Sequence, residues 1–187
     1  NSNNSNNSNN SNNSNNSNSN NNLINWNTNN PPRILKRLNK DLKLLYKKYG
    51  EENVEFSIDD EKYVFKIKYI NKNLLFELNR YNSDYPFRPP KFFIDGKKYR
   101  DILCLNDPIL KGYLRKMNIQ CLCCNTKLCH HLWVPCINLV NIVEEYVENR
   151  ELISRLLKIY YVKKICEQNN IHCLELHDLI SQHMLYK

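Results

Sequence analysis

Glycine is scarce in this sequence, with three residues among 187. The phosphate-binding loops GxxxxGK and GxGxxG need several glycines at short fixed spacings, so neither loop can be built here. Long apolar runs are lacking as well, because no stretch reaches the roughly 18 to 20 residues of a membrane-spanning helix. The first residues also lack the basic-then-apolar pattern of a secretory signal. These absences exclude nucleotide chemistry of the P-loop and Rossmann kinds and predict an intracellular protein with no membrane partner.

Charged residues are absent from positions 1–32, and an Asn-Asn-Ser repeat fills most of that stretch. A polar repeat has no apolar face to bury, so it predicts a disordered Asn/Ser-rich tail over residues 1–32. The net charge of +8 therefore belongs to residues 33–187, which we expect to form one folded domain. The enrichment in Asn, Lys and Ile indicates an A/T-rich coding sequence.

The folded part has more basic than acidic residues, and an excess of positive charge is also typical of proteins that bind nucleic acid. No aromatic-interleaved RNA motif, helix-turn-helix spacing or C-x2-C…H-x3-H finger accompanies the Lys and Arg residues. The sequence therefore argues against nucleic-acid binding, and it favours solvated helix faces as the place of these charges.

Hydrophobic periodicity in residues 33–187 changes from helical to strand spacing and back. Apolar residues recur every three or four positions from Ile34 to Tyr46, which predicts an N-terminal amphipathic helix that Gly50 ends. Period-two alternation then predicts four strands, at 54–58, 63–69, 74–78 and 91–94. Residues 99–135 show no clear period, and helical spacing returns at 139–147, at 152–165 and in a short segment at 174–184. This order predicts an α+β fold, with C-terminal helices on one face of a four-stranded antiparallel meander.

A proline-rich octapeptide, DYPFRPPK, occupies residues 84–91, between the third and fourth predicted strands. Its three prolines fix φ, so it predicts a rigid turn with its two aromatic residues packed beneath it. The octapeptide resembles the Y-P-F-K-P-P-K corner of ubiquitin-conjugating enzymes. Two further segments resemble the same family: RLNKDL at 37–42 is similar to the R-[LI]-x-K-E-L pattern of its first helix, and WVP at 133–135 is similar to its W-S-P-A segment.

The resemblance implies the ubiquitin-conjugating fold and its activity. A cysteine would accept ubiquitin or a ubiquitin-like modifier as a thioester from an ATP-dependent activating enzyme and pass it to a substrate lysine with the help of a ubiquitin ligase. No metal or organic cofactor is implied. The setting would be the cytoplasm or nucleus, of a host cell if the A/T-rich composition marks a divergent viral member of the family.

The resemblance also implies partner-binding residues. The basic face of the first helix, with Lys36, Arg37 and Lys40, would meet the activating enzyme or the ligase. A ligase-facing corner would consist of Phe87, Val134 and Pro135. For Phe87, simple core packing beneath the proline turn is an equally open interpretation.

One part of the family's active site is missing from this sequence. When the family's pattern is aligned with this sequence from Lys91 onward, its His-Pro-Asn falls at residues 100–102. These residues are Arg-Asp-Ile here. In the family, that asparagine is thought to support the oxyanion formed when a lysine attacks the thioester. Asn106 is the candidate replacement, and a turn-forming role beside Asp107 and Pro108 is the alternative. Without the asparagine, the chain could instead be a catalytically inactive binding module of the same fold.

All eight cysteines lie in residues 33–187, where a chain without an export signal keeps them as reduced thiols or metal ligands. Cys123 and Cys124 lie ten and nine residues before Trp133, inside the family's range, and are the candidate acceptors of the modifier. Nearby Lys127, His130 and His131 would favour a thiolate. Two alternatives stay open. The thiols could be small buried hydrophobic groups, or the C-x2-C pair of Cys121 and Cys124 could bind zinc with ligands drawn from Cys129, His130, His131 and Cys136.

Overall fold

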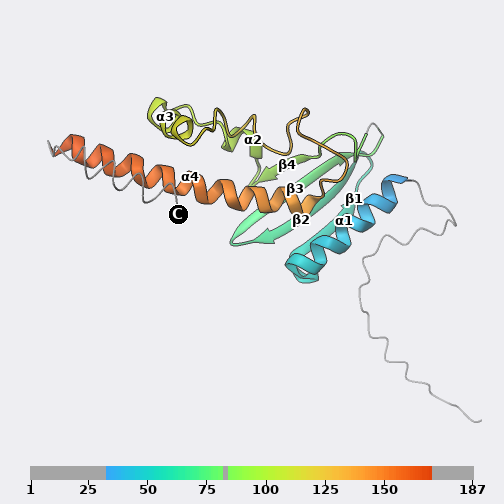
Figure 1. The fold of residues 1–187 in the computed structure, drawn as a ribbon. Coiled ribbons are helices and arrows are strands. Elements are labelled where there is room, and N and C mark those ends of the chain that lie inside the picture. Colours follow the sequence, from blue (N-terminus) through green and yellow to red (C-terminus); the bar gives the residue numbers. More distant parts are fainter. Residues whose placement is uncertain (1–32, 82–83, 170–187) are drawn as a thin grey trace, which may run out of the picture.

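An antiparallel sheet of five strands, each paired with the next one along the chain, forms one layer of the structure, and helices lie on one face of it (Figure 1). The computed structural model describes residues 33–81 and 84–169. The predictions for the tail at 1–32 and for a helix at 174–184 lie outside these residues. The elements in chain order are α1 (Arg33–Tyr49), the 3-10 helix η1 (Glu51–Asn53), β1 (Val54–Ile58), β2 (Lys62–Tyr69), β3 (Lys72–Asn79), β4 (Lys91–Ile94), β5 (Lys97–Lys98), α2 (Tyr99–Ile102), α3 (Pro108–Lys116) and α4 (Leu139–Gln168).

The α+β class and the four predicted strands are confirmed, each strand to within two residues of its predicted bounds. The strands follow one another as a meander, with β2 paired to β3 from Lys62↔Asn79 to Tyr69↔Lys72. The fifth strand was not predicted, because β5 has only two residues and pairs only with the end of β4. Two residues are too few to show an alternation of apolar and polar side chains.

The expectation of an irregular segment over residues 99–135 is wrong in part, because α2 and α3 lie within it. A single turn such as α2 is too short to show a period. The start of α3 carries a local signal, since the Asp107 carboxylate accepts hydrogen bonds from the backbone N–H groups of Ile109 and Leu110 and Pro108 follows it directly. Asp followed by Pro is thus an N-cap and first helical residue here, and not a free turn.

The two segments of helical spacing at 139–147 and 152–165 belong to one helix, α4. Asn138 caps its start through a reciprocal pair of hydrogen bonds with Asn141. Residues 148–151 between the two apolar segments are polar but contain no helix breaker, so the backbone continues through them. No helix in the described part of the chain combines the length and the apolar character that crossing a membrane requires.

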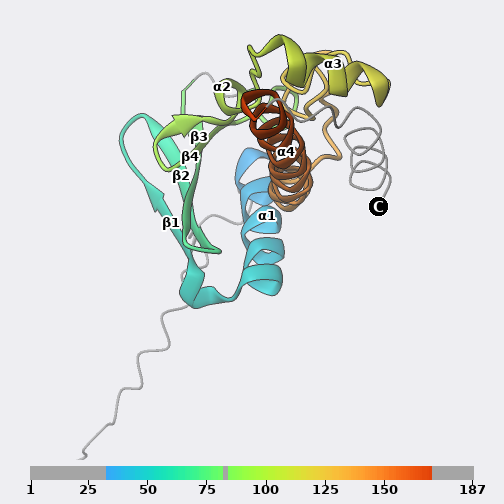
Figure 2. The same cartoon turned by 90° about the vertical axis from the view of Figure 1, so that its left-hand side faces the viewer.

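The core lies between the sheet and two helices on the same face of it. Figure 2 shows the sheet nearly edge-on, with α1 and α4 on one side. Leu38, Leu42 and Leu45 of α1 are fully buried there, as the helical spacing of the sequence predicts. They join the inner side chains of the strands and α4, which include Phe65, Ile67, Phe76, Ile142 and Val143. One end of this two-layer core carries the octapeptide turn, and the long segment between α3 and α4 runs past it.

Candidate functional site

The three sequence motifs at 37–42, 84–91 and 133–135 meet at one end of the sheet. Asp41 of α1 is fully buried, and its Oδ2 accepts hydrogen bonds from the Tyr85 hydroxyl and, at 3.0 Å, from Arg37 Nε. Its other oxygen, Oδ1, is buried and has no hydrogen-bond partner among the described residues. Burial raises the pKa of Asp41 above its ordinary value, while Tyr85 and Arg37 oppose that rise. A carboxylate with two such donors joins the first helix to the octapeptide turn.

The same arginine also holds the third motif. Arg37 Nη1 donates to the backbone carbonyl of Pro135 at 2.8 Å, and Nη2 donates to that of Ile137 at 2.5 Å. The indole Nε1 of Trp133 donates to the backbone carbonyl of Pro86 at 2.7 Å. The turn and the Trp133 segment are therefore bonded directly to each other, and both are bonded to α1.

Apolar side chains are exposed on the surface of the turn and of the Trp133 segment. Phe87 is 75% exposed and Val134 is 47% exposed, and Pro135 beside it is also exposed. The interpretation of Phe87 as core packing is therefore wrong. The expectation that both aromatic residues pack beneath the turn holds for Tyr85, which is 4% exposed, and fails for Phe87. We refer to Phe87, Val134 and Pro135 as the apolar corner.

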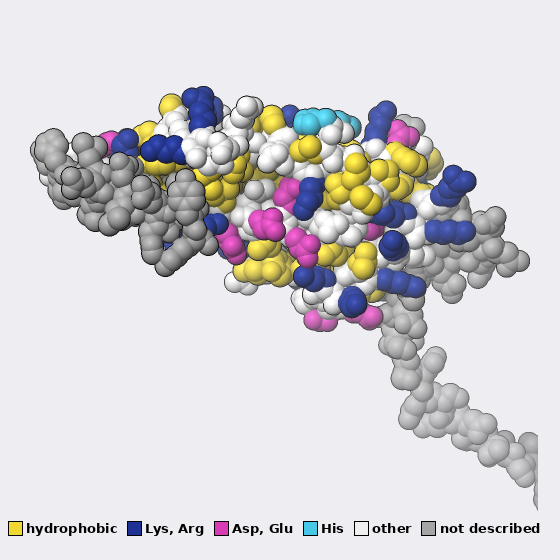
Figure 3. Space-filling view, viewed as in Figure 1, with side chains coloured by type: hydrophobic (Ala, Val, Ile, Leu, Met, Phe, Trp, Pro, Cys, Tyr) yellow, Lys and Arg dark blue, Asp and Glu magenta, His cyan; other side chains and the backbone are white. Residues whose placement is uncertain are grey.

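Basic side chains of α1 lie on the solvent side of the helix. Figure 3 shows Lys and Arg side chains gathered over α1, and the predicted partner-binding residues Lys36 and Lys40 are exposed there. Arg37 differs from them, because its side chain is only 13% exposed and its donors bind Asp41, Pro135 and Ile137. The structure thus gives Arg37 an internal positioning role where the sequence predicted a partner contact.

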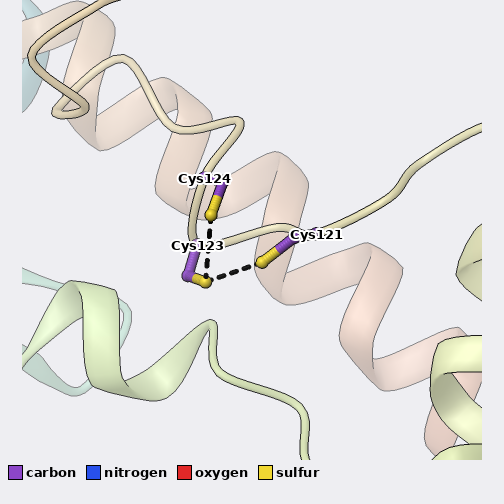
Figure 4. Close-up of side chains that lie close together, drawn as sticks. All are labelled: Cys121, Cys123 and Cys124. Atoms are coloured by element: carbon purple, nitrogen blue, oxygen red, sulfur yellow. Dashed lines mark hydrogen bonds between the residues drawn. The ribbon is translucent and has the colours of Figure 1, made fainter.

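Three cysteines between α3 and Trp133 turn their thiols toward one another (Figure 4). The Sγ atoms of Cys121 and Cys123 are 2.7 Å apart, and those of Cys123 and Cys124 are 3.9 Å apart. All three sulfur atoms lie within 4.8 Å of one another. The structure therefore gathers both candidate acceptors, Cys123 and Cys124, into one cluster with Cys121.

The environments of the three thiols differ. Cys123 is 7% exposed, Cys121 is half-buried and Cys124 is exposed. The hydrogen bond with Cys121, together with burial, raises the pKa of the Cys123 thiol, and the same hydrogen bond lowers the pKa of Cys121.

A fourth cysteine, missed by the sequence analysis, lies near the same cluster. Cys104 lies in the short segment between α2 and α3 and is exposed, and its side chain interacts with that of Cys123 from outside the group of three sulfur atoms. The local signal was only a cysteine between Leu103 and Leu105 in a segment without periodicity. Its partner thiol is 19 positions away, so no local spacing rule connects the two.

The cysteine loop is anchored to α4 by one buried carboxylate. Glu145 accepts hydrogen bonds from the Thr126 hydroxyl and, at 2.7 Å, from the backbone N–H of Lys127. The Tyr99 hydroxyl of α2 lies 3.4 Å from the same carboxylate and accepts a hydrogen bond from Asn149 at 2.8 Å. Thr126 and Glu145 are both buried. The residues directly after the cluster therefore have a fixed position on α4.

The other predicted site residues lie apart from the cluster. Asn106 is exposed, and within residues 33–81 and 84–169 no hydrogen bond joins it to the three thiols. Cys129 contacts His131, with 3.5 Å between Sγ and Nδ1. The alternative zinc set of the sequence analysis is therefore brought together only in part. The described residues place Cys121 and Cys124 with Cys123, and they leave Cys129, His130, His131 and Cys136 outside that group.

Comparison with known proteins identifies no family: no family model matches the chain, and no curated protein or solved structure matches it.

Proposed function

We propose that residues 33–169 form a ubiquitin-conjugating-like docking module, which presents the apolar corner and the basic face of α1 to a partner of the ubiquitin pathway. The partner of first choice is a ubiquitin ligase. The observation that carries the proposal is the meeting of the three family-like motifs through the hydrogen bonds of Arg37, Asp41 and Trp133. These motifs are far apart in the sequence but are in direct contact in the structure. Their contact supports a resemblance that extends over the whole fold and not only over short segments.

The chemistry of the corner suits a docking role. Exposed aromatic and apolar side chains on a rigid support lose little conformational freedom when a partner covers them. Phe87 lies on the turn that is fixed by the Tyr85 hydroxyl, which donates to Asp41, and by the Pro86 carbonyl, which accepts from the Trp133 indole. Val134 directly follows Trp133. A few large side chains near the centre of an interface carry most of its binding energy, and Phe87 is the candidate for that place here. Exposed Lys36 and Lys40 lie on the same helix as Arg37, which binds the Pro135 carbonyl, and they favour an acidic partner surface.

Two observations favour docking over transfer. Cys123, one of the two candidate acceptors, is 7% exposed, whereas an acceptor thiol must be reached by the carrier's thioester. Residues 100–102, where the family has His-Pro-Asn, form most of the single-turn helix α2 and supply no amide side chain for an oxyanion.

The apolar corner yields the first testable prediction. Phe87→Ala is expected to weaken binding of the RING domain of a ubiquitin ligase at least tenfold, because Phe87 would be a central anchor of the interface. Titration of the isotope-labelled protein, followed by NMR chemical-shift changes, measures the affinity and locates the surface. The matched control is Ile70→Ala, which removes another exposed apolar side chain at the β2–β3 turn, the opposite end of the sheet. Shifts centred on Ile70, or equal affinities for the two variants, would overturn the docking proposal.

Transfer of a modifier is the second candidate function, and the exposure of Cys124 favours it. The test is a charging reaction with activating enzyme, ATP and ubiquitin, resolved with and without reductant. If the chain is a carrier, a reductant-sensitive adduct forms and disappears in Cys124→Ser, while Cys136→Ser, which removes an exposed cysteine elsewhere, retains it. The docking module as proposed forms no such adduct, so an adduct specific to Cys124 would replace it with the transfer function.

A further inference from the structure

We propose that Cys104, Cys121, Cys123 and Cys124 are the ligands of one structural zinc ion. The inference goes beyond the docking function and does not rest on it, because it concerns a different set of residues and has its own measurement. It also differs from the zinc set considered from the sequence, which drew its further ligands from Cys129, His130, His131 and Cys136.

The spacing of the sulfur atoms suits tetrahedral coordination. Zinc holds each thiolate at about 2.3 Å, so two thiolates on one ion are about 3.8 Å apart. The Sγ atoms of Cys123 and Cys124 already have this separation, at 3.9 Å. The sulfur atoms of Cys121 and Cys123, at 2.7 Å, are closer than an ion between them allows, so one of these side chains would have to rotate when the ion binds. The whole group of three spans no more than 4.8 Å.

Cys104 supplies the fourth ligand from a different part of the chain. Its side chain interacts with that of Cys123, and it comes from the segment between α2 and α3, 17 positions before Cys121. Structural zinc sites are typically closed by ligands from two separate segments in this manner, and four cysteines form a complete set. An all-thiolate set selects a soft or borderline metal such as zinc over magnesium or calcium, which prefer oxygen ligands.

The binding step balances without a further reactant. Four thiols release four protons, and the dication binds the four resulting thiolates to give a complex with a net charge of −2. No electron is transferred. The ion would link the segment after α2 to the loop that leads to Trp133, and so add a second attachment to the one at Glu145.

A zinc ion at this place and a thioester on Cys123 or Cys124 exclude each other, because a thiolate that ligates the metal is not free to accept the modifier. The site therefore gives the cysteine cluster a role that is compatible with a docking module and replaces the predicted acceptor role of these residues.

The experiment measures metal directly on the full chain, with Zn²⁺ and Co²⁺ as the probes. After purification in zinc-containing medium and exhaustive buffer exchange, elemental analysis is expected to find one zinc per chain. Replacement by Co²⁺ is expected to give the thiolate-to-cobalt charge-transfer bands and the strong visible bands of a tetrahedral thiolate site. Cys104→Ser is expected to weaken zinc binding by more than about 100-fold in competition with a chromogenic chelator, while Cys136→Ser binds as the unaltered chain does.

Each contrary outcome is specific. A chain that binds no zinc and titrates as free thiols overturns the site, as does a mass two hydrogens lower, which would mean a disulfide between two of these cysteines. Zinc that is lost in Cys129→Ser and retained in Cys104→Ser assigns the ion to the other ligand set and overturns the role of Cys104. The unaltered chain decides the first two outcomes even if a variant fails to fold. Because Phe87→Ala leaves the thiols untouched, failure of docking and failure of metal binding are distinguished.

Discussion

Replacing Arg37 with alanine is expected to lower the free energy of unfolding by about 3 kcal/mol, because removing one partner of a buried ion pair leaves the other charge uncompensated. Asp41, fully buried, would keep only the Tyr85 hydroxyl as a donor. The backbone carbonyls of Pro135 and Ile137 would lose their partners in the same substitution. Urea unfolding, followed by circular dichroism, measures the change. Lys43→Ala, which removes an exposed cation of the same helix, is the control and is expected to change stability by less than about 0.5 kcal/mol.

The pH dependence of this loss identifies its cause. Burial raises the pKa of Asp41 in the folded protein, and without Arg37, which opposes that rise, the pKa would be higher still. When the pKa of a carboxyl group is higher in the folded than in the unfolded protein, ionisation of that group destabilises the folded state. The cost is complete at pH values above the folded pKa, and it disappears as the pH falls through the folded pKa. The deficit of Arg37→Ala is therefore expected to be largest at neutral pH and to shrink in mildly acidic solution. A deficit that stays constant with pH would mean that lost packing, and not the unpaired charge, causes it.

The sequence predicts the regular part of this structure because local patterns determine it. Helical spacing places Leu38, Leu42 and Leu45 on the buried face of α1, and period-two alternation gives the strands. The octapeptide also gave the position of a turn. Its two aromatic residues, however, flank the same proline, and only the fold determines that Tyr85 points inward to Asp41 while Phe87 points outward.

The candidate sites depend on contacts that no local pattern encodes. The interpretation of Arg37 as a surface residue followed from its place among lysines on the polar side of α1, yet its long side chain reaches carbonyls about 100 positions away. The Cys104 side chain interacts with Cys123 only because the segment after α2 passes beside the loop before Trp133. The sequence offered spacing to Trp133 as a guide to the acceptor, but spacing does not reveal which thiol is exposed.

The second large effect concerns the anchor of the cysteine loop. Glu145→Ala is expected to lower the free energy of unfolding by about 2–3 kcal/mol, because it leaves the buried Thr126 hydroxyl and the Lys127 N–H without an acceptor, and each orphaned donor costs about 1–3 kcal/mol. The Tyr99 hydroxyl loses a contact as well. Urea unfolding measures the stability, and hydrogen exchange at the Lys127 amide reports on the loop itself.

Glu148→Ala is the matched control, since it removes an exposed carboxylate three residues further along α4 and is expected to leave both measurements nearly unchanged. Glu145→Gln is expected to fall between the two, because its amide oxygen still accepts one hydrogen bond while its NH₂ group faces a second donor. If the loop were held by its cysteines alone, exchange at Lys127 would be as slow in Glu145→Ala as in the control. Faster exchange at Lys127, with zinc content unchanged at one per chain, would instead show that the carboxylate and the metal hold the loop independently.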